Sequence, residues 1–173
     1  MALAFGAGAC DIAFQLDHIP DAPVGCPASY DLTTPATTTS YRLVTDPVPW
    51  ADAAGRCAAH ALPDSIDRTH LAVIANDAEL EFVRTLTTAQ LWIGLSSRRE
   101  PSTYLWVTIE PAASSYAAWA LGQPDNLEAA CAAINAATVA DGLFYDRECE
   151  NYQFAFLCEC DRFADAPARY SPL

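Results

Sequence analysis

The chain has 173 residues, a length that suits one domain with a sizeable core and short tails. Hydrophobic residues make up 52% of it, which excludes a chain that is disordered throughout. The formal net charge is −13, lysine is absent and the arginines are scattered singly, so no basic stripe is present that could bind nucleic acid.

Residues 1–25 are predicted to be a leader and linker. The apolar run MALAFGAGAC ends at Cys10 and resembles the end of a bacterial lipoprotein signal, in which small residues precede a cysteine that receives lipid. The composition, rich in Ala, Asp, Pro and Arg, is also typical of a GC-rich bacterial genome. Against a lipid anchor, Ala7 replaces the usual leucine and no basic segment precedes the run, so an ordinary flexible leader is the alternative.

The first regular elements are expected after residue 40. Residues 40–44 have the composition of a strand. Residues 46–62 are predicted to be a helix that begins near Asp46 and its neighbouring prolines. Apolar residues recur along this helix at spacings of three and four, namely Trp50, Ala54, Cys57 and Ala61.

A second helix is predicted after the short apolar run 70–75. Asn76 and Glu79 stand three residues apart, which is typical of a capped helix start. The expected buried stripe of this helix consists of Ala78, Phe82, Val83 and Leu86.

The second half of the chain is expected to form strands around a long loop. The predicted strands cover 91–97, 104–108, 131–136, 142–146 and 152–160. Helices followed by strands indicate an α+β fold, here a single domain over 26–162 with a C-terminal tail at 163–173. Residues 109–130 form an irregular connection, and a loop of that length is often functional. No segment has the roughly 18 consecutive apolar residues that span a bilayer, so a membrane is expected as a partner only through lipid at Cys10.

The cysteines indicate the compartment. There are seven, none in a CxxC pair, and the three histidines (His18, His60 and His70) are too scattered to complete a zinc site. Setting Cys10 aside leaves six, enough for three disulfides in an oxidising compartment. We therefore expect a secreted or surface-anchored protein; free thiols in a cytosolic protein are the alternative.

Five ordered motifs resemble the C-type lectin-like domain over about residues 26–160. They are Trp-Ile-Gly-Leu at 92–95, Trp119 followed by Gly-Gln-Pro-Asp, FYDREC at 144–149, FLCE at 156–159 and the segment HLAVIANDAELEFV. The resemblance implies two helices flanking short antiparallel sheets, with a long loop region. It also implies the disulfides Cys57–Cys158 and Cys131–Cys149, and leaves Cys26 and Cys160 to pair. In this frame Trp92, Trp106 and Trp119 are core residues rather than sugar-stacking platforms.

Sugar-binding members of that family hold Ca²⁺ with a loop like the one at 123–125. The resemblance assigns Gln123, Asp125, Glu128 and Asp146 as metal ligands, and adds Asn126 to the ligand-binding set. These are oxygen donors, which Ca²⁺ prefers, and vicinal sugar hydroxyls can complete its shell. The proline between the first two ligands is a cis peptide in the family, and the order Gln-Pro-Asp is associated with galactose-type sugars.

Two departures from the family pattern keep a second function open. Tyr145 replaces the expected asparagine, and Glu128 is one residue away from the expected acidic position, Ala129. We therefore expect a binding module that holds carbohydrate through a weak or partial Ca²⁺ site, or a calcium-independent domain that binds a surface protein. An enzyme is not expected, since Ser96 and Ser97 lack a GxSxG context and the loop carboxylates have no histidine partner.

Overall fold

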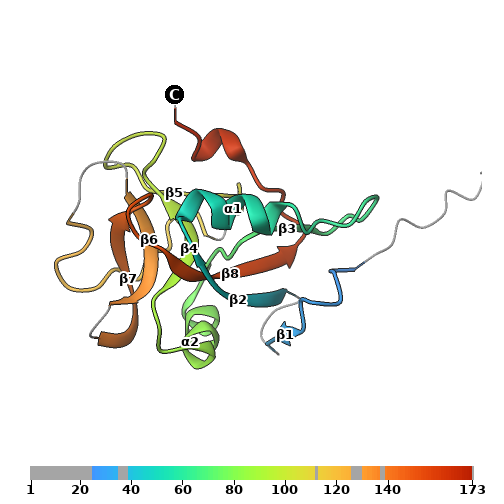
Figure 1. Ribbon diagram of the computed structural model, residues 1–173, viewed down its shortest axis with the longest axis horizontal. Coiled ribbons are helices and arrows are strands. Elements are labelled where there is room, and N and C mark those ends of the chain that lie inside the picture. The colour runs from blue at the N-terminus through green and yellow to red at the C-terminus, as the bar shows by residue number, and fades with distance from the viewer. Residues whose placement is uncertain (1–24, 35–38, 112, 126–129, 137–138, 173) are drawn as a thin grey trace, which may run out of the picture.

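The structure is a computed structural model, and it describes residues 25–34, 39–111, 113–125, 130–136 and 139–172 (Figure 1). Within these residues, eight strands form one sheet with the path β1-β2-β8-β4-β6-β7, to which β3 adds by pairing with β8 and β5 by pairing with β4. The strands are β1 (Leu32–Thr33), β2 (Ser40–Val48), β3 (Arg68–Leu71), β4 (Leu91–Ser96), β5 (Leu105–Trp106), β6 (Ala130–Ala136), β7 (Val139–Glu148) and β8 (Phe154–Asp161). The sheet is mixed rather than purely antiparallel, because β4 and β8 run parallel.

Helix α1 (Trp50–Ala58) begins later and ends earlier than the sequence predicts. Asp46 is not at the helix start: it belongs to β2, which continues to Val48. Pro49 takes the position before the first helical residue with an extended ψ of 156°, and a proline is tolerated there because that N–H has no helical partner. The expected inner face is largely right, since Trp50, Ala54 and Cys57 are buried.

Helix α2 (Asp77–Leu86) has the expected cap, and Phe82, Val83 and Leu86 of the expected stripe face the core. The side chain of Asn76 accepts a hydrogen bond from the Glu79 N–H at 3.0 Å. Ala78 is exposed, contrary to the predicted stripe, whereas Glu79 is buried. The helix is therefore turned so that a carboxylate, rather than a methyl group, faces the sheet.

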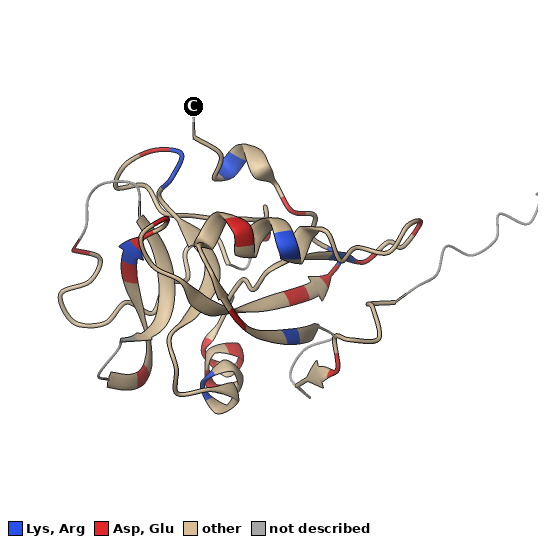
Figure 2. Ribbon diagram, viewed as in Figure 1, with Lys and Arg blue, Asp and Glu red and all other residues tan. Residues whose placement is uncertain are grey.

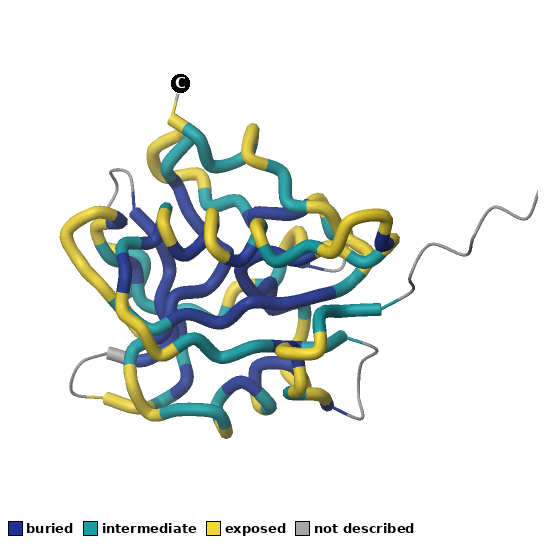
Figure 3. Tube along the Cα trace, turned by 45° about the vertical axis from the view of Figure 1, so that its right-hand side comes forward, coloured by how far each residue is buried: buried dark blue, intermediate teal, exposed yellow. Residues whose placement is uncertain are grey.

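The centre of the sheet is the most deeply buried part of the molecule (Figure 3). The indole N–H groups of Trp50 and Trp92 donate to the carbonyls of Ile93 and Val48 at 2.8 and 2.9 Å, so both buried rings are satisfied. Gly94 lies where a side chain would not fit, since a Cβ there would be 2.7 Å from the Leu71 carbonyl oxygen. These contacts explain the Trp-Ile-Gly-Leu motif. Trp106 is buried as expected, and Trp119 is partly buried against the core.

Three disulfides join distant parts of the chain, and they are the pairs that the sequence resemblance and the remaining cysteines imply. Cys57–Cys158 ties α1 to β8, Cys131–Cys149 ties β6 to the end of β7, and Cys26–Cys160 ties the N-terminal segment to β8. After β8 the chain returns over the core, where the Tyr170 ring packs against Trp50 with centroids 5.3 Å apart. In the part of the chain that the structure describes, neither helix has the length and apolar character needed to cross a bilayer.

Candidate functional site

The loop after Trp119 brings an amide and a carboxylate to the end of β7. The peptide bond between Gln123 and Pro124 is cis, as the family pattern implies. Gln123 is partly buried and Asp125 is exposed. Gly122, just before them, has a φ of 84°, a left-handed conformation that glycine adopts without strain.

Asp146 on β7 is the buried partner of this loop. Its backbone N–H donates to Gln123 Oε1 at 3.0 Å, and its Oδ1 accepts from the Asp125 N–H at 3.1 Å. Only 2% of Asp146 is exposed, because β6 pairs beside it through Ala132 and the loop covers it. The loop and the strand are therefore joined at Asp146, by the side chain of Gln123 and by the backbone of Asp125.

Tyr104 also belongs to this group, although the sequence gives no indication of it. Its hydroxyl donates to Asp146 Oδ2 at 3.2 Å, so both carboxylate oxygens of Asp146 are hydrogen-bonded. Burial, followed by the nearby Asp146 charge, raises the pKa of Tyr104 above its usual value, which keeps the phenol protonated. The ring packs edge-on against Trp119 with centroids 4.8 Å apart. Tyr104 thus fixes the orientation of the carboxylate.

The donor set has the chemistry of a Ca²⁺ site. Gln123 can offer its amide oxygen, and Asp125 and Asp146 their carboxylate oxygens; oxygen ligands suit a hard cation, and Ca²⁺ takes about six to eight of them. The described residues supply fewer than that number. Glu128 and Asn126, the other residues expected here, lie outside the described part of the chain.

Tyr145, at the position where the family has asparagine, is engaged elsewhere. Its hydroxyl donates to Asp141 Oδ2 at 2.6 Å, and this hydrogen bond, more than burial, raises the pKa of the phenol. The second oxygen of Asp141 accepts from the Leu143 N–H at 2.9 Å. Tyr145 and Asp141 thus form a contact within β7, and neither is joined to Gln123 or Asp125 by the hydrogen bonds described.

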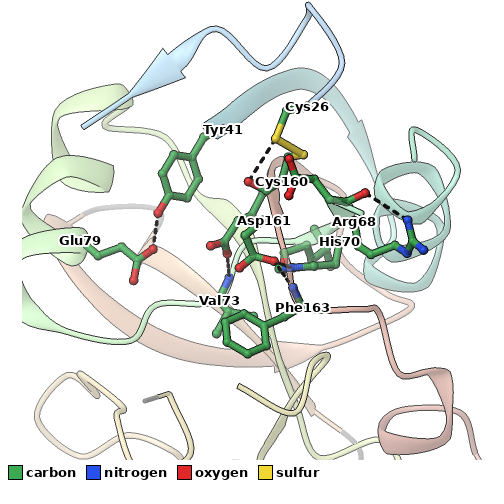
Figure 4. A network of polar contacts seen from close by, with 12 residues as sticks. Cys26, Tyr41, Arg68, His70, Val73, Glu79, Cys160, Asp161 and Phe163 are labelled. Atoms are coloured by element: carbon green, nitrogen blue, oxygen red, sulfur yellow. Dashed lines mark hydrogen bonds and ion pairs between the residues drawn. A yellow bond between two sulfur atoms is a disulfide. The ribbon is translucent and has the colours of Figure 1, made fainter. Parts of the chain in front are cut away.

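A second polar cluster lies on the face of the sheet toward which Tyr41 points, between α2 and the end of β8 (Figure 4). Glu159 Oε2 accepts from the Val73 N–H at 2.7 Å, and His70 Nε2 lies 3.1 Å from Asp161 Oδ1. Tyr41 donates to Glu79 in the same region. One ligand atom from each of His70, Glu159 and Asp161 lies within 4.8 Å of the others. Their hydrogen bonds account for these side chains, so we assign no metal to them.

A comparison with protein families identifies the family to which this sequence belongs. The family described as "Lectin C-type domain" matches residues 46–160, which is most of the chain. The chain belongs to the C-type lectin family. This family is one of binding domains, consistent with the expectation that the protein is not an enzyme.

One curated relative of this C-type lectin domain is the alpha-N-acetylgalactosamine-specific lectin of Patiria pectinifera. The two are 34% identical over 98 residues, which are 52% of this chain and 56% of that lectin. The chain therefore spans little more than half the length of the relative that it matches.

Solved structures show the same fold. The C-type lectin CEL-I from Cucumaria echinata superimposes with a TM-score of 0.64 at 24% identity, covering 79% of this chain and 97% of that one. The mouse scavenger receptor C-type lectin carbohydrate-recognition domain gives a TM-score of 0.60 at 26% identity, covering 78% and 94%. A calcium-independent type II antifreeze protein gives 0.62 at 19% identity, covering 79% and 94%.

The lectins among these relatives come from animals, so they give no support to the bacterial, lipoprotein-like origin that the sequence suggests. Cys10, the expected lipidation site, lies outside the described residues.

Proposed function

We propose that this C-type lectin domain binds carbohydrate through a Ca²⁺ ion held by Gln123, Asp125 and Asp146, with Glu128 as a further ligand. The observation that carries the proposal is the hydrogen-bonded junction of the Gln-Pro-Asp loop with Asp146. This junction joins the Gln123 side-chain oxygen and the Asp125 backbone N–H to Asp146, which supports a site that combines oxygen ligands from the loop and from β7. Asn126, adjacent in sequence, is the remaining candidate for contact with the sugar.

A bound Ca²⁺ ion would supply coordination positions for two vicinal sugar hydroxyls. The protein's own part is to orient the oxygens: β6 and β7 fix Asp146, and Tyr104 and the Asp125 N–H hold the two oxygens of its carboxylate. The order Gln-Pro-Asp favours a galactose-type sugar in the family pattern. The Patiria pectinifera relative, named for its specificity for alpha-N-acetylgalactosamine, supports the same sugar class.

Tyr145 favours a second candidate function, a calcium-independent domain that binds a surface protein. Its phenol replaces an amide ligand and is hydrogen-bonded to Asp141 instead. A fold shared with a calcium-independent antifreeze protein is compatible with that function. The three disulfides suit an extracellular location, secreted or at the cell surface, where an oxidising environment maintains them.

Thermal unfolding with and without Ca²⁺ separates the two functions, because a ligand that binds only the folded state raises apparent stability. We expect millimolar Ca²⁺ to raise the Tm, and EDTA to reverse the change. Asp146→Asn should abolish the increase, whereas the exposed Asp31→Asn, with the same loss of charge, should retain it. Retention on galactose-agarose in Ca²⁺ and elution by EDTA would then establish sugar binding. No Tm shift at millimolar Ca²⁺ would favour the calcium-independent function.

A further inference from the structure

A pocket of about 260 Å³ lies between α1 and strands β2 and β8, and shares no residue with the Gln-Pro-Asp site. Three of its lining residues carry nitrogen-containing side chains and three are apolar. They are Arg42, Arg56 and His60, and Val44, Ala59 and Phe156. Lysine and arginine positions are few along the described chain (Figure 2), and two of the nine arginines line this pocket.

The alternation of side chains along the strands keeps this pocket away from the buried acids. On β2, Tyr41 points toward Glu79, so the next residue, Arg42, lies on the opposite face, toward α1. On β8, Cys158 faces α1 through its disulfide with Cys57, whereas Glu159 faces the other way. The sheet therefore separates Arg42 and Arg56 from the carboxylates of Glu79 and Glu159 on its other face.

Arg42 is a partly buried guanidinium with neutral partners. Its Nη1 lies 3.3 Å from both Ser29 Oγ and His60 Nε2. Over the described ranges, no acidic side chain comes within ion-pairing distance of Arg42. Removing a charge from water is costly unless an opposite charge accompanies it, so Arg42 would gain from a bound anion.

His60 and Arg56, the other two residues with nitrogen-containing side chains in the pocket, leave Arg42 available to bind an anion. Burial, and then the Arg42 charge, lower the pKa of His60 below its usual 6.5, so the ring is neutral at pH 7.4. Its Nε2 can then accept from Arg42. Arg56 pairs with Asp46 at 2.8 Å, but their side chains are 47% and 70% exposed, and such solvent-exposed pairs exchange partners at small cost.

We propose that this pocket binds a small organic carboxylate, with the carboxylate on Arg42 and an apolar body against Val44, Ala59 and Phe156. A guanidinium matches a carboxylate through two parallel hydrogen bonds. The volume is below the roughly 300 Å³ at which pockets for drug-sized molecules begin, so the ligand is small. The strongly negative chain disfavours a polyanion such as nucleic acid at the same place.

Benzoate tests the proposal, because it joins a carboxylate to a small apolar ring. Benzamide, which has nearly the same shape but no charge, is the control. The 173-residue chain, labelled with ¹⁵N, is titrated in Tris chloride at pH 7.4, which contains no other organic anion. We expect saturable shifts of the amide resonances of Val44, Ala59 and His60 with benzoate and not with benzamide. Equal responses to both compounds, or shifts that avoid these residues, would overturn the proposal.

Variants test the role of Arg42. Arg42→Gln should weaken benzoate binding at least about tenfold, because a charged hydrogen-bonding partner is lost. Arg162→Gln, the same change at an exposed residue outside the pocket, should bind as the wild type does. Arg42→Lys keeps the charge and should fall between them, which provides a test if Arg42→Gln does not fold. Wild-type affinity in both Arg42 variants, or binding of glucuronate but not benzoate, would contradict the proposal.

Discussion

The side-chain oxygen of Gln123 accepts a hydrogen bond from the backbone N–H of Asp146 at 3.0 Å, across 23 residues of sequence. The Asp125 N–H bonds back to the Asp146 carboxylate at 3.1 Å. The loop and the strand thus hold each other through two reciprocal contacts. The fold itself therefore joins the Gln-Pro-Asp loop to β7 at Asp146.

Tyr145→Asn is expected to strengthen Ca²⁺ binding. The substitution restores the amide oxygen of the family pattern, and one added oxygen ligand should lower the Kd severalfold. Calorimetric titration with Ca²⁺ measures the change. Tyr145→Phe is the matched control: it also removes the hydrogen bond to Asp141 but adds no oxygen, so its Kd should stay near that of the wild type. Equal Kd values for the two variants would show that residue 145 does not reach the ion.

Gly94→Ala should destabilise the domain by about 1–3 kcal/mol, because inserting a methyl group into a packed core displaces its neighbours. The new Cβ would lie 2.7 Å from the Leu71 carbonyl oxygen and 2.8 Å from Val107 Cγ2. Urea unfolding monitored by tryptophan fluorescence gives the free energy of unfolding. Gly55→Ala in α1 is the control: its Cβ would meet nothing within 4 Å, and alanine should stabilise the helix by about 0.5–1 kcal/mol. A neutral Gly94→Ala would show that the backbone can move apart at this point.

Removing the Cys57–Cys158 disulfide with a pair of alanines should cost about 4–5 kcal/mol in the chain-entropy model, since its cysteines are 101 residues apart. Cys131–Cys149 closes a separation of 18, for which the same model gives about 3 kcal/mol. Comparing the two double variants by urea unfolding checks the order. The reverse order would mean that local packing outweighs loop length.

Glu159→Gln should make the domain more stable at neutral pH. Burial raises the pKa of the Glu159 carboxyl well above its usual 4.5, and the charges of Glu79 and Asp161 raise it further. For a group whose pKa is raised on folding, the stability it contributes is fully present below the unfolded-state pKa and is lost as pH rises through the folded-state pKa. The glutamine does not ionise, so it avoids this loss.

Melting curves from pH 4 to pH 8, in EDTA so that no cation compensates the charge, test this expectation. The Tm of Glu159→Gln should exceed that of the wild type at pH 7.5, and the difference should shrink toward pH 4. The exposed Glu100→Gln serves as the control for lost charge and should show no such trend. A variant that is less stable than the wild type at every pH would show that the ionised carboxylate is stabilising.

Much of this fold could be predicted from short motifs because they reflect strong local constraints. Trp-Ile-Gly-Leu encodes three buried side chains and one position at which no side chain fits, and the resemblance to the family implies two of the three disulfides. The prediction that α1 begins near Asp46 was wrong. The spacing of apolar residues that indicates the helix does not reveal that β2 continues through Pro47 to Val48. The burial of Glu79 in place of Ala78 depends on Tyr41, which is 38 residues away in sequence.

The residues proposed for the site could be named from the sequence only where a motif carries them. Gln123 and Asp125 are separated by a single proline, and Asp146 lies in a recognisable strand, so all three could be named in advance. Tyr104 could not, because its contact with Asp146 spans 42 residues and no motif links the two positions. The pairing of Arg42 with neutral groups likewise depends on contacts between residues 13 and 18 positions apart in sequence, with Ser29 and His60.

The three disulfides are nested: Cys26–Cys160 encloses Cys57–Cys158, which in turn encloses Cys131–Cys149. A single proteolytic cut anywhere between residues 26 and 160 would therefore leave both fragments covalently joined. The Gln-Pro-Asp loop, exposed at Asp125, falls within two of the three closed rings. A protease that nicked it would yield a domain that still migrates as one species until a reductant separates the pieces.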